Sequence, residues 1–223
     1  MRMTTRCTDG KKMTQQLLQD VTDAKGLEAL YARTSYLLRE SRKEILRRYK
    51  VENEIALLDK VRQGAVTEHP GYEHYLSALI LEQMRAQIRA ELLVLEEGRT
   101  ETLPTMSVHL LFKEKLEQRY ADRMNEAPRL AQDALILSFD TGLLMEVRYY
   151  SGEEYSIEWS WNEIQLRIDT APVHVNQVNF RDHLHGVNGA LRTYAAAQAG
   201  TDCWENFSSL LDILLKNPLL EDK

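Results

Sequence analysis

Hydrophobic positions divide the chain into a helical first part and a strand-rich second part. Between residues 27 and 97, apolar side chains recur every three or four positions, which is the spacing of one face of an α-helix. From Ala134 onward, apolar and polar positions alternate, which is the spacing of strands. The pattern predicts an α+β fold: a helical N-terminal hairpin or bundle followed by a small antiparallel β-meander covered by helices.

Three helices are expected in the first part. One begins at Leu27 and continues to Ile45, a shorter one covers VENEIALLDKVRQ, and a long one runs from about Tyr72 to Glu97. Short connections between long helices favour antiparallel packing. The buried face of the middle helix is expected to contain Ile55, Leu58 and Val61.

Four strands are expected in the second part: ALILSF, LLMEVRYY, YSIEWSW and EIQLRID. Trp159 and Trp161 fall on the same face of the third strand, so both are expected to be buried. Two helices are candidates to cover this face, one expected over 107–125 and one after Asp202. Asp202 with Glu205 three residues later is a helix N-cap pattern.

A polar segment with a proline, RTETLPTM at 99–106, separates the two parts. We therefore expect a helical module at 1–100 and an α+β domain at 101–223. The first hundred residues carry a net charge of +2 and the remainder −8. We expect the helical module to pack on the acidic domain, with the basic residues of 39–50 at the contact. The same module is expected to bind a protein partner or a second copy of the chain.

Composition excludes several classes of protein. Hydrophobic residues make up 43% of the chain and charged residues 28%, as in globular proteins. No apolar run has the length of a membrane span, and the N-terminus lacks the apolar core of a secretory signal. Cys7 and Cys203 are too few for a disulfide framework, and the common phosphate-loop and hydrolase motifs are absent. We expect a cytoplasmic protein with no cofactor and no membrane contact.

Half of the six histidines lie between residues 167 and 186. His183 and His185 are separated by one residue, so in an extended segment their side chains point to the same side. An imidazole held by a carboxylate is oriented for proton transfer near neutral pH. The candidate catalytic residues are therefore His174, His183, His185, Asp182 and Asp169.

Arg167 and Arg181 are the candidate substrate-binding residues, because a guanidinium group can hold a phosphate. No metal is expected, since a closed four-ligand site near the histidines would need carboxylates that are distant in sequence. His69 and His74, on either side of Pro70, do not share a helix face and indicate packing at a helix entry. The residues alone leave two hypotheses open, a metal-independent nuclease site and a structural polar network.

A motif in this region extends the hypothesis. An Asp-x-Ala-Pro-x-His pattern is followed by two alternate histidines and by the amphipathic segment SSLLDILL, and a tryptophan-containing strand precedes them. With this pattern, residues of about 134–216 resemble the TumE family of bacterial toxin–antitoxin toxin components. The matching positions are Asp169, Ala171, Pro172, His174, His183 and His185. Val173 and Asp182 stand where the family has histidines, and the helical part resembles, less closely, small helical proteins found beside such toxins.

The resemblance implies a toxin-like module that acts on RNA as a metal-independent endoribonuclease, restrained or scaffolded by the helical module. The alternative is a non-enzymatic helical adaptor whose sheet binds a protein partner and whose histidines are structural. Convergence of the histidines and an arginine on an open cleft would favour the first hypothesis. Burial of the imidazoles would favour the second.

Overall fold

The computed structural model describes residues 24–97, 107–173, 182–187, 190–194 and 202–221. The linker expected at 99–106 lies outside these residues, and so do His174 and Arg181.

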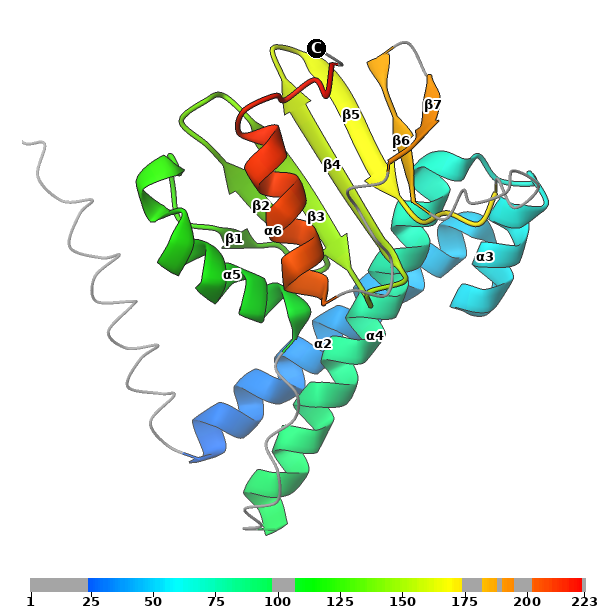
Figure 1. Cartoon of the computed structure of the whole chain (residues 1–223). Coiled ribbons are helices and arrows are strands. Elements are labelled where there is room, and N and C mark those ends of the chain that lie inside the picture. Colours follow the sequence, from blue (N-terminus) through cyan, green and yellow to red (C-terminus); the bar gives the residue numbers. More distant parts are fainter. Residues whose placement is uncertain (1–23, 98–106, 174–181, 188–189, 195–201, 222–223) are drawn as a thin grey trace, which may run out of the picture.

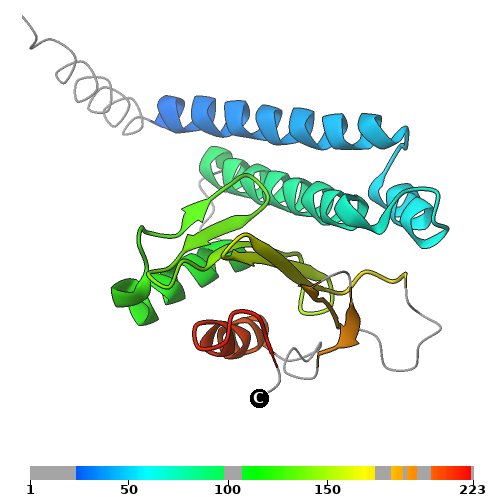
Figure 2. The same cartoon turned by 90° about the horizontal axis from the view of Figure 1, so that it is seen from above.

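In the described part of residues 24–97 the chain forms three helices: α2 (Ala24–Tyr49), α3 (Glu54–Arg62) and α4 (Glu68–Glu97). α2 and α4 lie side by side and run in opposite directions, as the helical periodicity predicts (Figures 1 and 2). Leu38 and Leu46 of α2 are buried, as are Leu76 and Ile80 of α4. The helical hairpin predicted from the sequence is therefore present.

The middle helix is predicted in the correct place but with one residue on the wrong face. α3 buries Leu57, Leu58 and Val61, whereas Ile55 is 71% exposed. Glu54 points inward instead, because its carboxylate pairs with Arg42 of α2 at 2.5 Å. This ion pair fixes the rotation of α3 and turns Ile55 toward solvent.

Among the described residues, seven strands form one antiparallel sheet, in which each strand pairs with its neighbour in the chain. They are β1 (Arg129–Leu130), β2 (Leu135–Ser138), β3 (Leu144–Tyr149), β4 (Tyr155–Trp161), β5 (Ile164–Asp169), β6 (His183–His185) and β7 (Leu191–Thr193). The four predicted strands correspond to β2 to β5, and the sheet is a meander as expected. β1, β6 and β7 were not expected, because two or three residues are too few to display an alternating pattern.

One face of the sheet carries the main hydrophobic core. Trp159 is 1% exposed, and Trp161 at the strand end packs on the same core while partly buried, so the predicted common face is correct. Two helices cover this face: α5 (Val108–Arg119), which the short turn η1 (Ala121–Arg123) follows, and α6 (Cys203–Leu214). Phe112 of α5 and Phe207 of α6 stack with ring centroids 5.0 Å apart. The side-chain carboxylate of Asp202 accepts hydrogen bonds from two backbone amides and caps α6, as predicted.

The other face of the sheet is polar and lies under α4, and α2 packs on the outer side of α4 (Figure 2). The expectation that the basic side chains of α2 contact the acidic domain is wrong for Arg42 and Lys43. These residues pair with Glu54 and Glu40 of the helical module, because α4 lies between α2 and the sheet. α2 instead reaches the second part through Ser41, whose hydroxyl is 2.8 Å from the Oε1 atom of Gln132.

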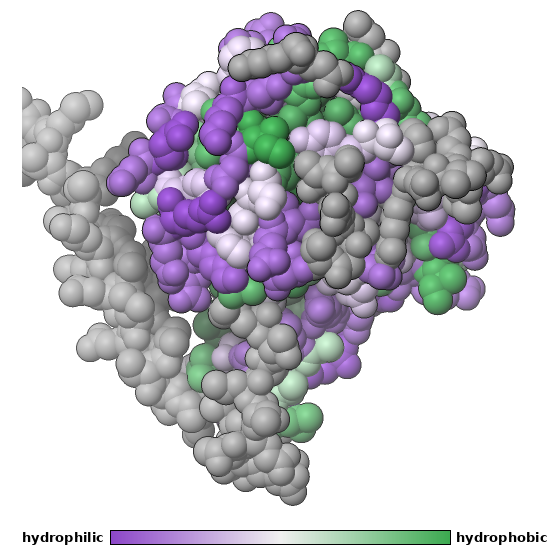
Figure 3. Space-filling model, viewed as in Figure 1, coloured by the Kyte–Doolittle hydropathy of each residue, from purple (hydrophilic) through white to green (hydrophobic). Residues whose placement is uncertain are grey.

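The surface is consistent with this arrangement of layers. Hydrophilic residues cover most of the face seen in Figure 3, and hydrophobic residues form small separate patches on it. Within the described part of the chain, no helix has the length and apolar character needed to cross a membrane.

Candidate functional site

Four of the predicted site residues come together where β5 and β6 pair. Asp169 lies directly opposite His183, and Arg167 lies directly opposite His185. Residues that face each other across antiparallel strands project from the same side of the sheet. His183 and His185 are two positions apart on one strand, so they share that side, as the sequence predicts.

The start of α4 brings three further polar residues to the same place. Pro70 disfavours a helical conformation in the preceding residue, and His69 is extended at φ −112° and ψ 133°. This extended corner directs Glu68 and His69 toward the sheet. The His69 Nε2 atom lies 3.1 Å from the His185 Nε2 atom, although 116 residues separate them in sequence. Glu73, one helical turn later, accepts a hydrogen bond from His69 Nδ1 at 2.8 Å.

His183 and Asp169 form the buried centre of the site. Both side chains are fully buried, and His183 Nε2 is 3.0 Å from Asp169 Oδ1 and 3.2 Å from Glu68 Oε1. Burial alone would lower the pKa of His183, but its hydrogen bonds to Asp169 and Glu68 raise that pKa to about 9. Burial alone would raise the pKa of Asp169, but the neighbouring imidazoles of His183 and His185 hold that pKa well below its usual range. At neutral pH the pair is therefore an imidazolium and a carboxylate.

Arg167 is held between carboxylates of the two layers. Its Nε atom lies 3.0 Å from Glu73 Oε1 of α4, and its terminal nitrogen pairs with Glu158 of β4. Burial would lower the pKa of Arg167, but the charges of Glu73 and Glu158 raise it. The candidate phosphate-binding residue is thus neutralised by carboxylates, one of which comes from the helical module.

Asp182, another predicted site residue, is oriented by a contact on the other face of the sheet. The Tyr155 hydroxyl donates a hydrogen bond of 2.6 Å to Asp182 Oδ1, and the Tyr155 ring lies in the hydrophobic core on the opposite face. Asp182 is therefore drawn toward the other side of the sheet. In the described part of the chain, the site comprises Asp169, His183, His185 and Arg167 from the prediction, with Glu68, His69 and Glu73 from α4.

The three site residues from α4 are hard to predict from the sequence. Glu68, His69 and Glu73 are about a hundred positions away from the other members of the site, and no motif of fixed spacing connects them. The one local signal is the segment EHP, because a proline after a histidine keeps that histidine out of the helix. That signal indicates an extended corner but not what the corner faces.

The cluster has two kinds of chemical capacity. An imidazole hydrogen-bonded to a carboxylate can transfer protons, and a nearby arginine can hold an anionic substrate. In addition, ligand atoms of Glu68, His69, Asp169 and His185 all lie within 4.8 Å of one another, which is close enough to ligate one metal ion.

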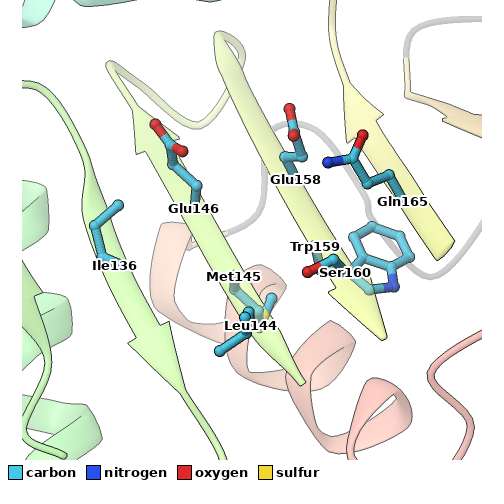
Figure 4. Close-up of a pocket in the computed structure, with 8 residues that line it drawn as sticks. All are labelled: Ile136, Leu144, Met145, Glu146, Glu158, Trp159, Ser160 and Gln165. Carbon is cyan, nitrogen blue, oxygen red and sulfur yellow. The ribbon is translucent and has the colours of Figure 1, made fainter. Parts of the chain in front are cut away.

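A shallow hollow lies on the same polar face, over β2 to β5. Glu146 of β3 and Glu158 of β4 are direct cross-strand partners, and both carboxylates border the hollow beside Ser160 and Gln165 (Figure 4). Ile136 supplies an apolar wall. Each carboxylate is already paired within the sheet, Glu146 with Arg148 and Glu158 with Arg167, so the hollow carries little uncompensated negative charge.

Comparison with known proteins gives a match to a family in the helical part of the chain. Residues 3–100 match the Uncharacterized protein MJ0235 family, and the match ends three residues after the last residue of α4. No curated protein and no solved structure matches the chain significantly. The similarity to a known family is thus found in the helical part.

Proposed function

We propose that the sheet carries an acid–base site directed at RNA and that the helical module holds this site in check. The observation that carries the proposal is the contact of Glu73 and Glu68 with Arg167 and His183. A carboxylate presents two anionic oxygens, as a phosphate group does, so both glutamates occupy groups that a phosphate ester would need. The resemblance of residues 134–216 to the TumE family supplies the substrate class.

The modular character of the chain supports the same proposal. Similarity to the MJ0235 family covers 3–100, which corresponds closely to the helical unit. The helices contribute their carboxylates through one short corner and one turn of α4, so a small displacement of α4 exposes Arg167. Restraint of this kind needs no separate inhibitor chain.

The proposal is tested with charge-neutral substitutions in the full chain. The double variant Glu68→Gln/Glu73→Gln removes both carboxylate charges and is expected to slow bacterial growth on expression and to cleave labelled total RNA. Adding His183→Ala and His185→Ala to it should abolish both effects. The matched control is Glu82→Gln, because Glu82 also lies on α4 but pairs with Arg85 and Arg89 of α4 and with Arg42 of α2, away from the cluster. A double variant that cleaves RNA no better than the wild type contradicts the proposal.

The second candidate function is a non-enzymatic interaction protein. The full burial of His183 favours it, because a buried imidazole that is already paired with carboxylates stabilises the layer contact and cannot reach a substrate. If the double variant remains inactive on RNA and the His183→Ala variant loses only stability, this second function is the better description.

A further inference from the structure

The geometry points to a binding site for a divalent transition-metal ion of the zinc class, formed by Glu68, His69, Asp169 and His185. This inference stands apart from the proposed action on RNA. It also reverses the expectation from sequence spacing that no metal is bound, because α4 supplies the distant carboxylate that such a site requires.

The distances between the ligand atoms agree with one central ion. Four ligands arranged tetrahedrally at about 2.0–2.1 Å from zinc are separated from each other by about 3.3–3.4 Å. In this cluster His69 Nε2 is 3.1 Å from His185 Nε2, 3.5 Å from Asp169 Oδ2 and 3.8 Å from Glu68 Oε1. His185 Nε2 is 3.3 Å from Asp169 Oδ2 and 3.7 Å from Glu68 Oε1. These separations bracket the tetrahedral value.

A buried oxygen aims into the same point without a hydrogen bond. Asp169 is fully buried, and its Oδ1 atom accepts from the Ala171 amide and from His183 Nε2. Its Oδ2 atom lies 3.3 Å from His185 Nε2 and 3.5 Å from His69 Nε2, but among the described residues neither contact has the alignment of a hydrogen bond. A buried carboxylate oxygen in this state costs free energy unless a cation or a donor meets it. An ion at this point would be ligated by Oδ2 and by both Nε2 atoms.

The contacts of His69 also favour its role as a metal ligand. Glu73 binds the Nδ1 atom of His69 at 2.8 Å, which places the proton on Nδ1 and directs the lone pair of Nε2 into the cluster. Carboxylate support of this kind is usual for histidines that bind zinc. Glu73 is in turn held by Arg167 at 3.0 Å.

The donor set indicates the class of metal. Two imidazole nitrogens and two carboxylate oxygens suit zinc and neighbouring transition metals, whereas magnesium and calcium prefer oxygen donors alone. Two ligands come from α4 and two from the sheet, so a bound ion joins the two layers directly. Metal binding should therefore stabilise the full chain.

The test uses full-length protein without a histidine tag, treated with a chelator and then titrated with zinc chloride or cobalt chloride. We expect one equivalent of Zn2+ to bind, a higher unfolding temperature in its presence, and the visible absorption of four-coordinate Co2+. His185→Gln should lose this binding and the cobalt spectrum. Glu73→Gln leaves all four ligands in place and should weaken zinc binding by about 10–100-fold.

His74→Gln is the matched control, because His74 lies on the same helix and contacts Tyr49 and Arg48 outside the cluster. It should bind zinc like the wild type. Failure of the full-length protein to take up zinc overturns the inference. Equal loss of binding in His74→Gln and His185→Gln overturns it as well, because that result indicates adventitious binding. Zinc uptake, the unfolding temperature and the cobalt spectrum do not depend on RNA cleavage. A negative result in these measurements therefore does not decide the test of the proposed function.

Discussion

Protonation of one buried histidine should make the fold sensitive to mild acid. His109 of α5 is buried, and its Nε2 atom accepts a hydrogen bond of 3.1 Å from the backbone amide of Tyr149. The pairing of β3 with β2 ends at Val147 and Leu135, so the imidazole takes the place of a missing strand partner. An imidazolium carries a proton on Nε2 and cannot accept this bond.

The magnitude follows from the pKa of His109. Burial lowers this pKa from 6.5 to about 4, so the unfolded chain binds the proton first as the pH falls. The stabilising contribution is complete above the unfolded pKa of 6.5 and is lost progressively between pH 6.5 and about 4. At pH 5 the loss amounts to about 2 kcal/mol of the free energy of unfolding.

The assay compares urea unfolding of the wild type and His109→Gln at pH 7.5 and pH 5. Glutamine offers the Tyr149 amide a carbonyl oxygen as acceptor and does not titrate. The wild type should lose about 2 kcal/mol more than the variant between the two pH values. Equal losses in the two proteins would refute the reasoning, since other titrating groups would then account for the whole pH dependence.

Three further predictions concern stability. Trp159→Ala should lower the free energy of unfolding in urea by about 3–5 kcal/mol, because a fully buried ring is removed. A loss below about 1 kcal/mol, the scale of one methylene group, would show that the core rearranges. Asp202→Ala should cost about 1 kcal/mol and increase hydrogen exchange at the start of α6, because two amides lose their acceptor; unchanged exchange there would contradict the capping role. Gly142→Ala should cost about 1 kcal/mol, because Gly142 has φ +81°, and an unchanged thermal midpoint would show that the turn relaxes.

The sequence predicts those elements whose pattern repeats within the element itself. α4, β3, β4 and α6 contain enough residues for a period of 3.6 or 2 to be recognised, and their places were correct. β6 has three residues, so its extended conformation could be proposed only from the alternating His183 and His185. Burial of the polar face is harder to predict than the position of a strand. Ser156 is predicted to face away from the core, but in the structure it is buried under α4.

The site was predicted only for the side that the sheet supplies. Asp169, Arg167, His183 and His185 are near each other in sequence, and the alternation of strands is enough to place each pair on one face. Contacts with α4 depend on the packing of two layers, which no local period encodes. For this reason His69 was assigned to helix packing, although its imidazole lies within 3.5 Å of Asp169.

The order of the elements along the chain has a consequence for protein synthesis. α2, α3 and α4 precede all seven strands, so the ribosome releases the helical hairpin before it makes β5 or β6. Each new strand then pairs with the one synthesised just before it, and such local contacts form quickly. During translation, therefore, α4 is already available when the cluster of Asp169, His183 and His185 is completed, and the polar face need never be exposed in a nascent chain.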